Sequence, residues 1–479
     1  MSVPKQAPGW AVLTLLCLGQ LMVVLDVSIV NVALPAIRAD LGFTEVGLQW
    51  VVNSYALTYC GFLLLGGRAA DLFGRRRVFV AGLALFTLAS LAGAVAQDPT
   101  VLVVARSVQG LGGAILSPAT LTLVTTIFTG AARPRAMAAW TAVAGGGAAL
   151  GSVLGGVLTG LIDWRWILWV NVPIGVLAIV AAYMVLPESR AEGERPRLDV
   201  LGSLLVTVGL IALAYGIVNT TGEGWGAIGT LVPLIGGAVL LAWFLFHEER
   251  VAREPLMPLR FFRTRSVTVA NLTMFWLGCA VIAHFYFLSL YMQNVLHYGP
   301  LAAGLGFLPG AAVMTIGAYS GPALMKRFGL RPLAIFGPVL VVAGLVWLSF
   351  IPVQGSFVTH LLVPMMLVTF GTGVAMMPIN FAAMTGIAPQ EAGLASGMIN
   401  TTRQVGGAVG LAVLATIAAT RTGASAQTMV DGYGLAFLIG GGFAVLAVLT
   451  SLAMPKTAGL PAAPPPQPAE STDASPSPA

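Results

Sequence analysis

One acidic side chain of this sequence lies deep within a long apolar segment. Asp26 is well inside the apolar run of residues 10–35, whereas the other acids fall between such runs or near their ends. A charge in hydrocarbon is costly, and removal from water favours the neutral form of a carboxyl group. Asp26 could therefore bind a proton and later release it. It is the candidate proton carrier, and a structural carboxylate held by a neighbouring helix is the alternative.

Two arginines and a histidine also fall within apolar runs, namely Arg106, Arg403 and His284. A cation near Asp26 would favour the ionised carboxylate. Arg403 has no acid in the last six apolar runs to pair with. It either bonds to carbonyl groups and reaches the membrane interface, or takes part in transport. His284 could relay protons, but a lone histidine is more often a hydrogen-bonded structural residue.

Aromatic, methionine and amide side chains within the apolar runs are the candidates for contact with a bound molecule. Such soft, adaptable side chains suit many ligand shapes better than one. With His284 and Arg403, the predicted binding set comprises Asn31, Gln49, Trp50, Asn53, Tyr55, Asn271, Phe275, Trp276, Tyr286, Met292, Met376 and Asn380.

A strip of glycines recurs in the run 136–160. Gly147, Gly151 and Gly155 are spaced by four residues and so share one face of a helix. Another helix can pack closely against such a face, which would also allow the two helices to rock against each other. A moving interface and static close packing explain these glycines equally well.

The elements that must position these residues are membrane-spanning helices. Hydrophobic residues make up 57% of the 479 residues and charged residues 9%, and the mean hydropathy is +0.90. A span takes roughly 20 apolar residues, longer than a barrel strand. Fourteen such runs are present: 10–35, 47–67, 78–96, 101–127, 136–160, 167–186, 199–219, 227–246, 267–291, 301–324, 332–351, 359–380, 393–418 and 434–453.

The net charge of +6 reflects membrane topology and not a nucleic-acid partner. If the N-terminus is cytoplasmic, nineteen of the 24 basic residues fall on the cytoplasmic side, three fall outside, and two lie within spans. This asymmetry predicts an even number of spans with both termini in the cytoplasm. The first run is too long for a cleaved signal peptide and is retained as a helix.

Other classes of function lack support in the sequence. Cys17, Cys60 and Cys279 all fall in apolar runs, so neither a disulfide nor a metal site is inferred. There is no phosphate-binding loop of the Gly-x-x-x-x-Gly-Lys-Ser/Thr type, no His-Glu-x-x-His and no soluble domain to carry catalysis. We expect neither enzymatic activity nor a cofactor.

An internal repeat organises the chain. The loop 66–77 resembles the loop 321–331 when Gly74 is aligned with Gly329. Each loop follows the second helix of a group of six if the seventh and eighth spans are set aside as an inserted pair. The alternative is that any cytoplasmic turn acquires glycine and arginine. The predicted units are 1–190, 191–265, 266–458 and a disordered tail, 459–479, rich in Pro, Ala and Ser.

Several motifs carry a resemblance to a known family. Residues 66–77 resemble the signature loop G-x-L-a-D-r-x-G-r-k-x of the major facilitator superfamily, and 106–114 resemble its R-x-x-Q-G-x-G-A signature of the fourth helix. The segment 25–35, L-D-V-S-I-V-N-V-A-L-P, resembles the first-helix motif of drug:proton antiporters with fourteen spans. Residues 164–175 and 291–310 also look like that subfamily. The resemblance extends from the first span to the last.

This resemblance implies a major facilitator fold of two six-helix bundles plus two helices between them. It implies that Asp71 and Arg75 latch the two halves on the cytoplasmic side, that Arg106 acts on the protonation site, and that the glycine helix is of the antiporter type. One departure is that residues 125–130 offer no acid to complete the latch.

The implied function is the export of a small hydrophobic drug or antibiotic in exchange for protons. The protein would be a monomer in a bacterial inner membrane, driven by the proton gradient. An exporter of an endogenous metabolite or of an antibiotic made by its own host is the first alternative. A proton-coupled importer is less favoured.

Overall fold

The computed structural model describes residues 8–130, 132–188, 198–252, 255–387, 391–423 and 425–455. Within these ranges the chain forms helices and short turns, and no strand occurs. Every predicted apolar run coincides with helix, which confirms the all-α fold. The predicted tail lies outside the described residues.

The first half of the chain contains ten α-helices, counting the inserted pair and two short segments. They are α1 (Gly9–Leu41), α2 (Glu45–Leu48), α3 (Trp50–Phe73), α4 (Arg75–Ala94), α5 (Pro99–Ile127), α6 (Ala132–Leu161), α7 (Trp166–Trp169), α8 (Asn171–Val185), α9 (Val200–Glu223) and α10 (Ile228–Arg250). The short α7 and α8 together make one span.

The second half contains seven α-helices and three short helices of other types. They are η1 (Leu259–Arg263), α11 (Arg265–Leu290), η2 (Tyr291–Val295), α12 (Pro300–Gly306), α13 (Leu308–Phe328), α14 (Leu330–Leu348), η3 (Phe357–Leu362), α15 (Val363–Met384), α16 (Ala392–Ala419) and α17 (Ala426–Leu452). Thirteen helical stretches of the described chain are long and apolar enough to cross a membrane. The 30-residue α6 covers the remaining predicted span, the fifth in chain order (136–160).

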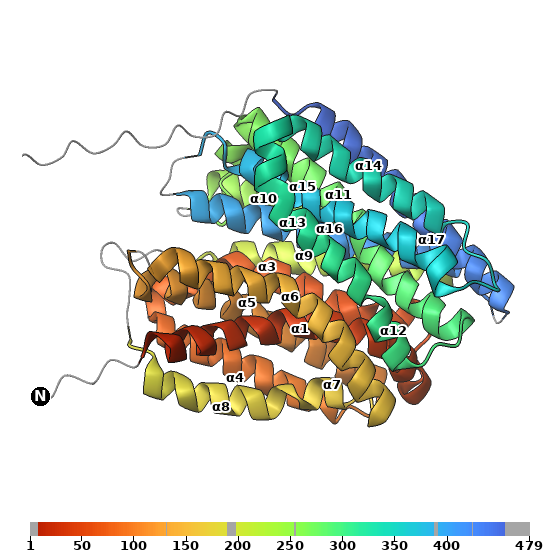
Figure 1. The fold of residues 1–479 in the computed structure, drawn as a ribbon, viewed down its shortest axis with the longest axis horizontal. Helices are drawn as coiled ribbons and strands as arrows, with labels where there is room; N and C mark the ends of the chain where they lie inside the picture. The colour runs from red at the N-terminus through yellow and green to blue at the C-terminus, as the bar shows by residue number, and fades with distance from the viewer. Residues whose placement is uncertain are drawn as a thin grey trace, which may run out of the picture.

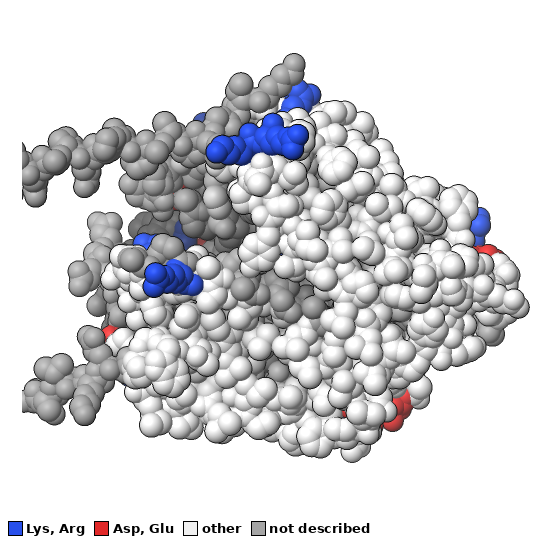
Figure 2. Space-filling model, viewed as in Figure 1, with Lys and Arg blue, Asp and Glu red and all other residues white. Residues whose placement is uncertain are grey.

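The helices form two groups that lie one above the other in Figure 1. The first group packs α1, α3, α4, α5, α6 and α8 together, and the second packs α11 and α13 to α17. The short α12 lies between the groups beside α6 (Figure 1). Charged side chains on the face shown in Figure 2 lie at the two ends of the molecule, with a broad uncharged belt between them. The belt is the surface expected of a protein surrounded by lipid.

The two loops of the internal repeat adopt similar turns. Gly74 separates α3 from α4 with φ of 103°, and Gly329 separates α13 from α14 with φ of 87°. Residues with a side chain rarely adopt such positive φ values, so glycine permits the abrupt end of one helix and the start of the next. The aligned glycines therefore have the same structural role in the two groups.

The glycine strip of α6 faces α1. A Cβ atom on Gly151 would lie 2.7 Å from the carbonyl oxygen of Leu25, and one on Gly155 would lie 2.6 Å from that of Ile29. The next glycine, Gly156, faces α12 in the same way, 2.6 Å from the carbonyl oxygen of Pro300. The strip thus brings α6 into backbone contact with α1, and the adjacent Gly156 brings α6 into contact with α12, which lies between the groups.

Two hydrogen bonds join the groups near the end of α1. Ser289 Oγ donates to the carbonyl oxygen of Asn31 at 2.8 Å, and Gln293 Nε2 donates to that of Val32 at 2.9 Å. Both acceptors belong to the half of α1 that lies away from the N-terminus. The two groups are therefore tied together at the end of the molecule opposite the N-terminus.

The inserted helices pack on the outside of the junction between the groups. The helix α9 contacts α3, α16 and α10, and the main neighbour of α10 is α9. Leu57 and Cys60 of α3, Leu210 of α9, and Ala408 and Ala412 of α16 form one buried apolar cluster. Many side chains of α10, in contrast, are exposed. The surface of α10 is therefore available to lipid.

The glycine strip makes a testable prediction about stability. In Gly151→Val, the new side chain cannot fit against Leu25 and Ser28, so α6 must move away from α1. We expect a loss of about 1–3 kcal/mol in the free energy of unfolding, seen as a lower Tm of the purified protein in detergent. Gly236→Val in α10 is the control, because an added Cβ there meets no atom within 4 Å. Equal Tm values for the two variants would contradict the close packing.

Candidate functional site

Asp26 forms an ion pair with Arg106 inside the first group of helices. Arg106 Nη1 lies 2.5 Å from Asp26 Oδ2, and the exposed fractions of the two side chains are 2% and 0%. Because both charges are removed from water and from lipid, each must be compensated within the protein. The two intramembrane charges that the sequence places in different spans are thus brought into direct contact.

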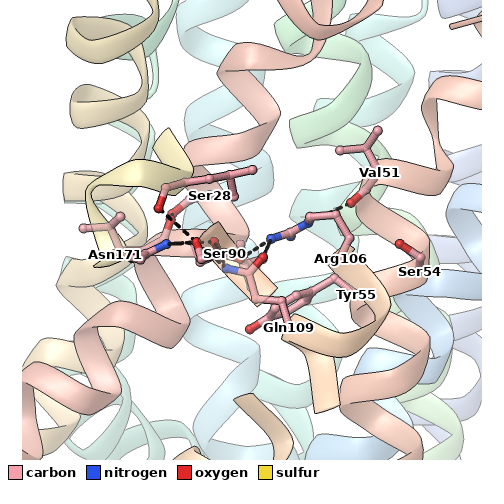
Figure 3. A network of polar contacts seen from close by, with 12 residues as sticks. Ser28, Val51, Ser54, Tyr55, Ser90, Arg106, Gln109 and Asn171 are labelled. Atoms are coloured by element: carbon pink, nitrogen blue, oxygen red, sulfur yellow. Dashed lines mark hydrogen bonds and ion pairs between the residues drawn. The ribbon is translucent and has the colours of Figure 1, made fainter. Parts of the chain in front are cut away.

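Three further side chains complete the surroundings of the carboxylate. Gln109 Nε2 donates to Asp26 Oδ1 at 2.8 Å, and Asn171 Nδ2 approaches the same oxygen at 3.4 Å. Ser90 Oγ accepts hydrogen bonds from both amides, at 3.2 Å from Gln109 and 3.0 Å from Asn171, and donates to the carbonyl oxygen of Leu168. Asp26 therefore lies in a polar cluster built from α1, α4, α5 and α8. Figure 3 shows Ser90, Arg106, Gln109 and Asn171 of this cluster.

The guanidinium of Arg106 has partners other than Asp26. Its Nε donates to the carbonyl oxygen of Val51 at 3.1 Å, and Nη1 also donates to Gln109 Oε1 at 2.6 Å. Its central carbon lies 4.4 Å from the centre of the Tyr55 ring, within the range of a cation–π contact. Figure 3 shows Arg106 extended between Gln109 and the backbone of Val51. These contacts would continue to hold the cation if the carboxylate became neutral.

Glycines of the fourth span explain how the helices come close enough for these contacts. A Cβ atom on Gly110 would lie 2.4 Å from the carbonyl oxygen of Tyr55 in α3, and one on Gly112 would lie 2.6 Å from the backbone nitrogen of Phe86 in α4. The absence of side chains thus lets α5 press against α3 and α4 on two sides. Arg106 and Gln109, one turn apart on α5, are thereby brought to Val51 and Ser90.

Most of the amides predicted to bind a ligand are engaged within their own helices. Asn31 Nδ2, Asn271 Nδ2 and Asn380 Nδ2 each donate to the carbonyl oxygen four residues earlier, at 3.0, 2.9 and 2.6 Å. Asn53 Nδ2 donates to Gln49 Oε1 at 3.5 Å, and both side chains are fully buried. The structure therefore does not bring these amides together into one site.

The aromatic and methionine residues of the predicted set are distributed over several places. Trp50 lies against the Tyr215 ring of α9, with ring centres 6.4 Å apart, so it packs at the inserted pair. Trp276 lies between Phe275 and Phe443, with ring centres 5.0 and 5.9 Å away. Tyr286 and Met292 hold buried core positions, and Met376 packs partly buried against the same core, which extends over both groups.

His284 and Arg403 are ionisable residues of the second group. His284 is fully buried, and neither ring nitrogen has a hydrogen-bond partner among the described residues. Arg403 Nη2 donates to Asn400 Oδ1 at 3.1 Å, and its side chain is partly buried on α16. No described carboxylate forms an ion pair with Arg403. Among the described residues, neither side chain forms a hydrogen bond or ion pair with a member of the Asp26 cluster.

The predicted latch is described in part. The side chain of Asp71 lies outside the described part of the chain, and Arg75 begins α4. The two arginines that follow Arg75 approach Glu188 beyond the end of α8, with the Nε atoms of Arg76 and Arg77 at 3.6 and 3.5 Å from Oε2. An acid that follows the sixth span thus lies beside the signature loop.

Three members of the Asp26 cluster were absent from the predicted set. Gln109 and Asn171 lie inside the stretches 106–114 and 164–175, whose motif resemblance was a usable signal. Ser90 carries no such signal, because one serine in an apolar run is unremarkable until its neighbours are known. Among the described residues, no group of three or more His, Cys, Asp and Glu side chains is arranged to hold a metal ion.

Comparison with known proteins decides the family. Residues 16–411 match the family model of the Major Facilitator Superfamily. The chain belongs to this superfamily. As a major facilitator protein with many apolar helices, it is a multi-pass membrane protein. Solved structures agree on the fold of this facilitator: a D-xylose–proton symporter superposes with a TM-score of 0.66 at 15% identity, covering 93% of this chain and 98% of that one.

Similar sequences of this facilitator family carry names of antibiotic exporters. The cephamycin export protein CmcT of Amycolatopsis lactamdurans is 43% identical over 454 residues, which cover 93% of each chain. The puromycin resistance protein pur8 of Streptomyces alboniger is 38% identical, covering 89% of this chain and 84% of that one. The tetracenomycin C resistance and export protein of Streptomyces glaucescens is 33% identical, covering 86% and 77%.

The buried ion pair predicts a non-additive effect on stability. Arg106→Met leaves the Asp26 carboxylate buried without its cation, which we expect to cost about 3–5 kcal/mol. The double variant Asp26→Leu with Arg106→Met removes both charges and should be more stable than Arg106→Met alone. Thermal unfolding of the single and the double variant in detergent at neutral pH measures their stabilities.

Arg421→Met is the matched control for loss of an arginine, because Arg421 is exposed beyond the end of α16. Its Tm should equal that of the wild type. Additive effects of Asp26→Leu and Arg106→Met would contradict the direct interaction of the two charges.

Proposed function

We propose that this protein is a proton-coupled antiporter that exports hydrophobic drugs or antibiotics across a bacterial cell membrane by alternating access. The observation that carries the proposal is the fully buried Asp26–Arg106 pair in a major facilitator fold. The names of its similar relatives, which refer to antibiotic export and resistance, support the choice of substrate class.

In this proposal Asp26 exchanges its arginine for a proton. A proton arriving at Asp26 neutralises the carboxylate and removes the main attraction between Asp26 and Arg106. Arg106 keeps the carbonyl oxygen of Val51, the ring of Tyr55 and Gln109 Oε1, so the cation is not left without compensation. The cluster therefore has two chemically reasonable states, one with the ion pair and one with a neutral acid. Such a pair of states is what coupling to a proton gradient requires.

The first helix is placed to pass this change to the other group. The ion pair of α1 is formed by Asp26, and the glycines of α6 contact α1 at Leu25 and Ile29. The hydrogen bonds from the second group reach the carbonyl oxygens of Asn31 and Val32. All of these lie within two turns of one helix. We infer that a shift of α1 on protonation alters the contacts that close the outer end. The topology inferred from the charges places both termini in the cytoplasm.

In this proposal the substrate contacts the second group of helices, and Arg403 in particular. Arg403 lies on α16, which packs against α3 of the first group, so it is near the junction of the groups. Its side chain donates a hydrogen bond to the neutral amide of Asn400. A partly buried cation without a carboxylate would attract an anionic group of a substrate. We therefore propose that Arg403, with Asn271 and Trp276 on the facing α11, contributes to binding.

An alternative is an exporter dedicated to one metabolite or self-made antibiotic. The relative with 43% identity is named for the export of one compound, cephamycin, which favours a narrow substrate range. Growth of a sensitive strain that expresses this chain, tested on a broad drug panel with and without an uncoupler, separates the two. Protection against many unrelated drugs indicates a multidrug exporter, and protection against one structural class indicates a dedicated one.

Asp26→Asn should abolish proton-driven efflux and preserve substrate binding. Asparagine has nearly the same shape and keeps one of the two acceptor oxygens, but it cannot carry a proton. We expect efflux driven by an imposed pH gradient in proteoliposomes to fall to the passive background. Asp431→Asn is the control, because Asp431 is exposed on α17. Normal gradient-driven efflux by Asp26→Asn would show that another group carries the proton.

Arg403→Gln should weaken the export of anionic antibiotics more than that of cationic ones. Removal of the cation raises the KM for anionic substrates, and Arg403→Lys should restore part of the affinity because it keeps the charge. Transport at varied substrate concentration in vesicles provides the comparison. Equal changes for anionic and cationic compounds would indicate a structural role for Arg403.

A further inference from the structure

Three ionisable side chains meet at the base of the inserted helices, away from the Asp26 cluster. Asp199 caps the start of α9, where its Oδ1 accepts from the backbone nitrogen of Gly202 at 2.8 Å. His247 Nε2, near the end of α10, lies 2.8 Å from the same oxygen. Glu248 Oε2 accepts from the backbone nitrogen of Met257 at 2.8 Å. The cluster thus joins the start of α9, the end of α10 and the segment that leads to η1.

These side chains are buried although they lie at helix ends. The side chains of His247 and Asp199 are 8% and 9% exposed, and Glu248 is 3% exposed. The adjacent Glu249 is exposed. Two carboxyl groups have therefore been removed from water within one small region, and each carries a large desolvation cost if it is ionised.

One oxygen of each carboxyl group remains without a hydrogen bond. Asp199 Oδ2 and Glu248 Oε1 are buried and have no partner in the part of the chain that the structure describes. Both face the same point, because a Cβ atom on Gly202 would lie 2.4 Å from Asp199 Oδ2 and 2.9 Å from Glu248 Oε1. Glycine at this position leaves the space in which the two carboxyl groups approach each other.

We propose that Asp199 and Glu248 share a proton between these two oxygens and form a proton-binding site distinct from Asp26. A protonated carboxyl oxygen is a donor and an ionised one is an acceptor, so one proton satisfies both atoms without any further group. Two ionised carboxylates in the same place would repel each other in a region that excludes water. The ligand of this site is the proton alone.

Among the residues that the structure describes, the other charged groups that act on the pair are His247 of α10 and Arg68 of α3. His247 is engaged with Asp199 Oδ1, on the side away from the shared proton. Arg68 Nη2 donates to the carbonyl oxygen of Pro255 at 2.7 Å, which holds the segment after α10 against the first group. A metal ion is not favoured, because the described residues contain no arrangement of such side chains suited to one.

The site has a direct consequence for how the molecule holds together. Glu248 binds the backbone of Met257 and Arg68 binds that of Pro255, so the segment entering the second group is fixed at this cluster. Loss of the shared proton places two negative charges side by side at this joint. The folded protein therefore holds the proton more tightly than the unfolded chain does, and its stability decreases as the pH rises through the range in which the proton is lost.

The test uses the full-length protein in detergent, with Glu248→Gln and the exposed neighbour Glu249→Gln as a matched pair. Glutamine keeps the acceptor for Met257 and supplies a permanent N–H donor toward Asp199. In wild type and Glu249→Gln, Tm should fall between about pH 6 and about pH 9, and this fall should be absent in Glu248→Gln. Infrared difference spectra should show the C=O band of a protonated carboxyl that disappears as the pH rises.

Asp26 could contribute a similar infrared band, so the spectra are also recorded in an Asp26→Asn background. The band should persist in Asp26→Asn and vanish when Glu248→Gln is added. Should Glu248→Gln fail to fold, Asp199→Asn serves as the second variant, because it keeps the cap oxygen and donates to Glu248. An unchanged band together with an unchanged fall of Tm in the glutamine variant would overturn the shared proton. The pH dependence would then belong to His247.

Discussion

The desolvation of two opposite charges inside an apolar bundle constrains the first group of helices. Asp26 and Arg106 can be buried only if every oxygen and nitrogen of the pair finds a partner, because neither lipid nor water compensates them there. Gln109, Asn171 and the carbonyl oxygen of Val51 meet that need. The partners come from helices that are far apart in sequence. The pair therefore determines how closely α1, α3, α5 and α8 must approach, and glycines of α5 make the approach possible.

The first helix joins this polar cluster to the surfaces that can move. One stretch of α1 carries the acid on one face, backbone contacts with the glycines of α6 on another, and carbonyl oxygens that accept hydrogen bonds from the second group. Because α6 also touches α12 through Gly156, a displacement of α1 acts on its own hydrogen bonds to the second group and on the contact of α6 with α12. Close backbone packing without large side chains permits small rocking movements, whereas interlocked side chains would resist them. The helices are thus held firmly around the ion pair, while the packing at the junction between the groups permits small movements.

Family membership and function rest on different evidence. A fold shared at 13–15% identity with sugar, nucleoside and peptide transporters says little about what is carried, because many substrates are handled by one architecture. The export names of relatives at 33–43% identity are more informative about the substrate class. The two helices between the groups, α9 and α10, add a further feature. Their base contains buried carboxyl groups of its own, and their outer surface is available to lipid.

The sequence by itself determined the number and type of the spanning segments and singled out Asp26, because hydropathy is a property of each segment and a charge within hydrocarbon stands out in one dimension. It also located Gly74 and Gly329 as equivalent turns. Only the tertiary structure decided which helix faces meet. It paired Asp26 with Arg106 and added Ser90 to their cluster. It also placed Trp50 beside the inserted helices, and it showed that several of the predicted amides donate hydrogen bonds within their own helices. Contacts between residues 80 or more positions apart depend on how whole helices pack, and no local pattern encodes that packing.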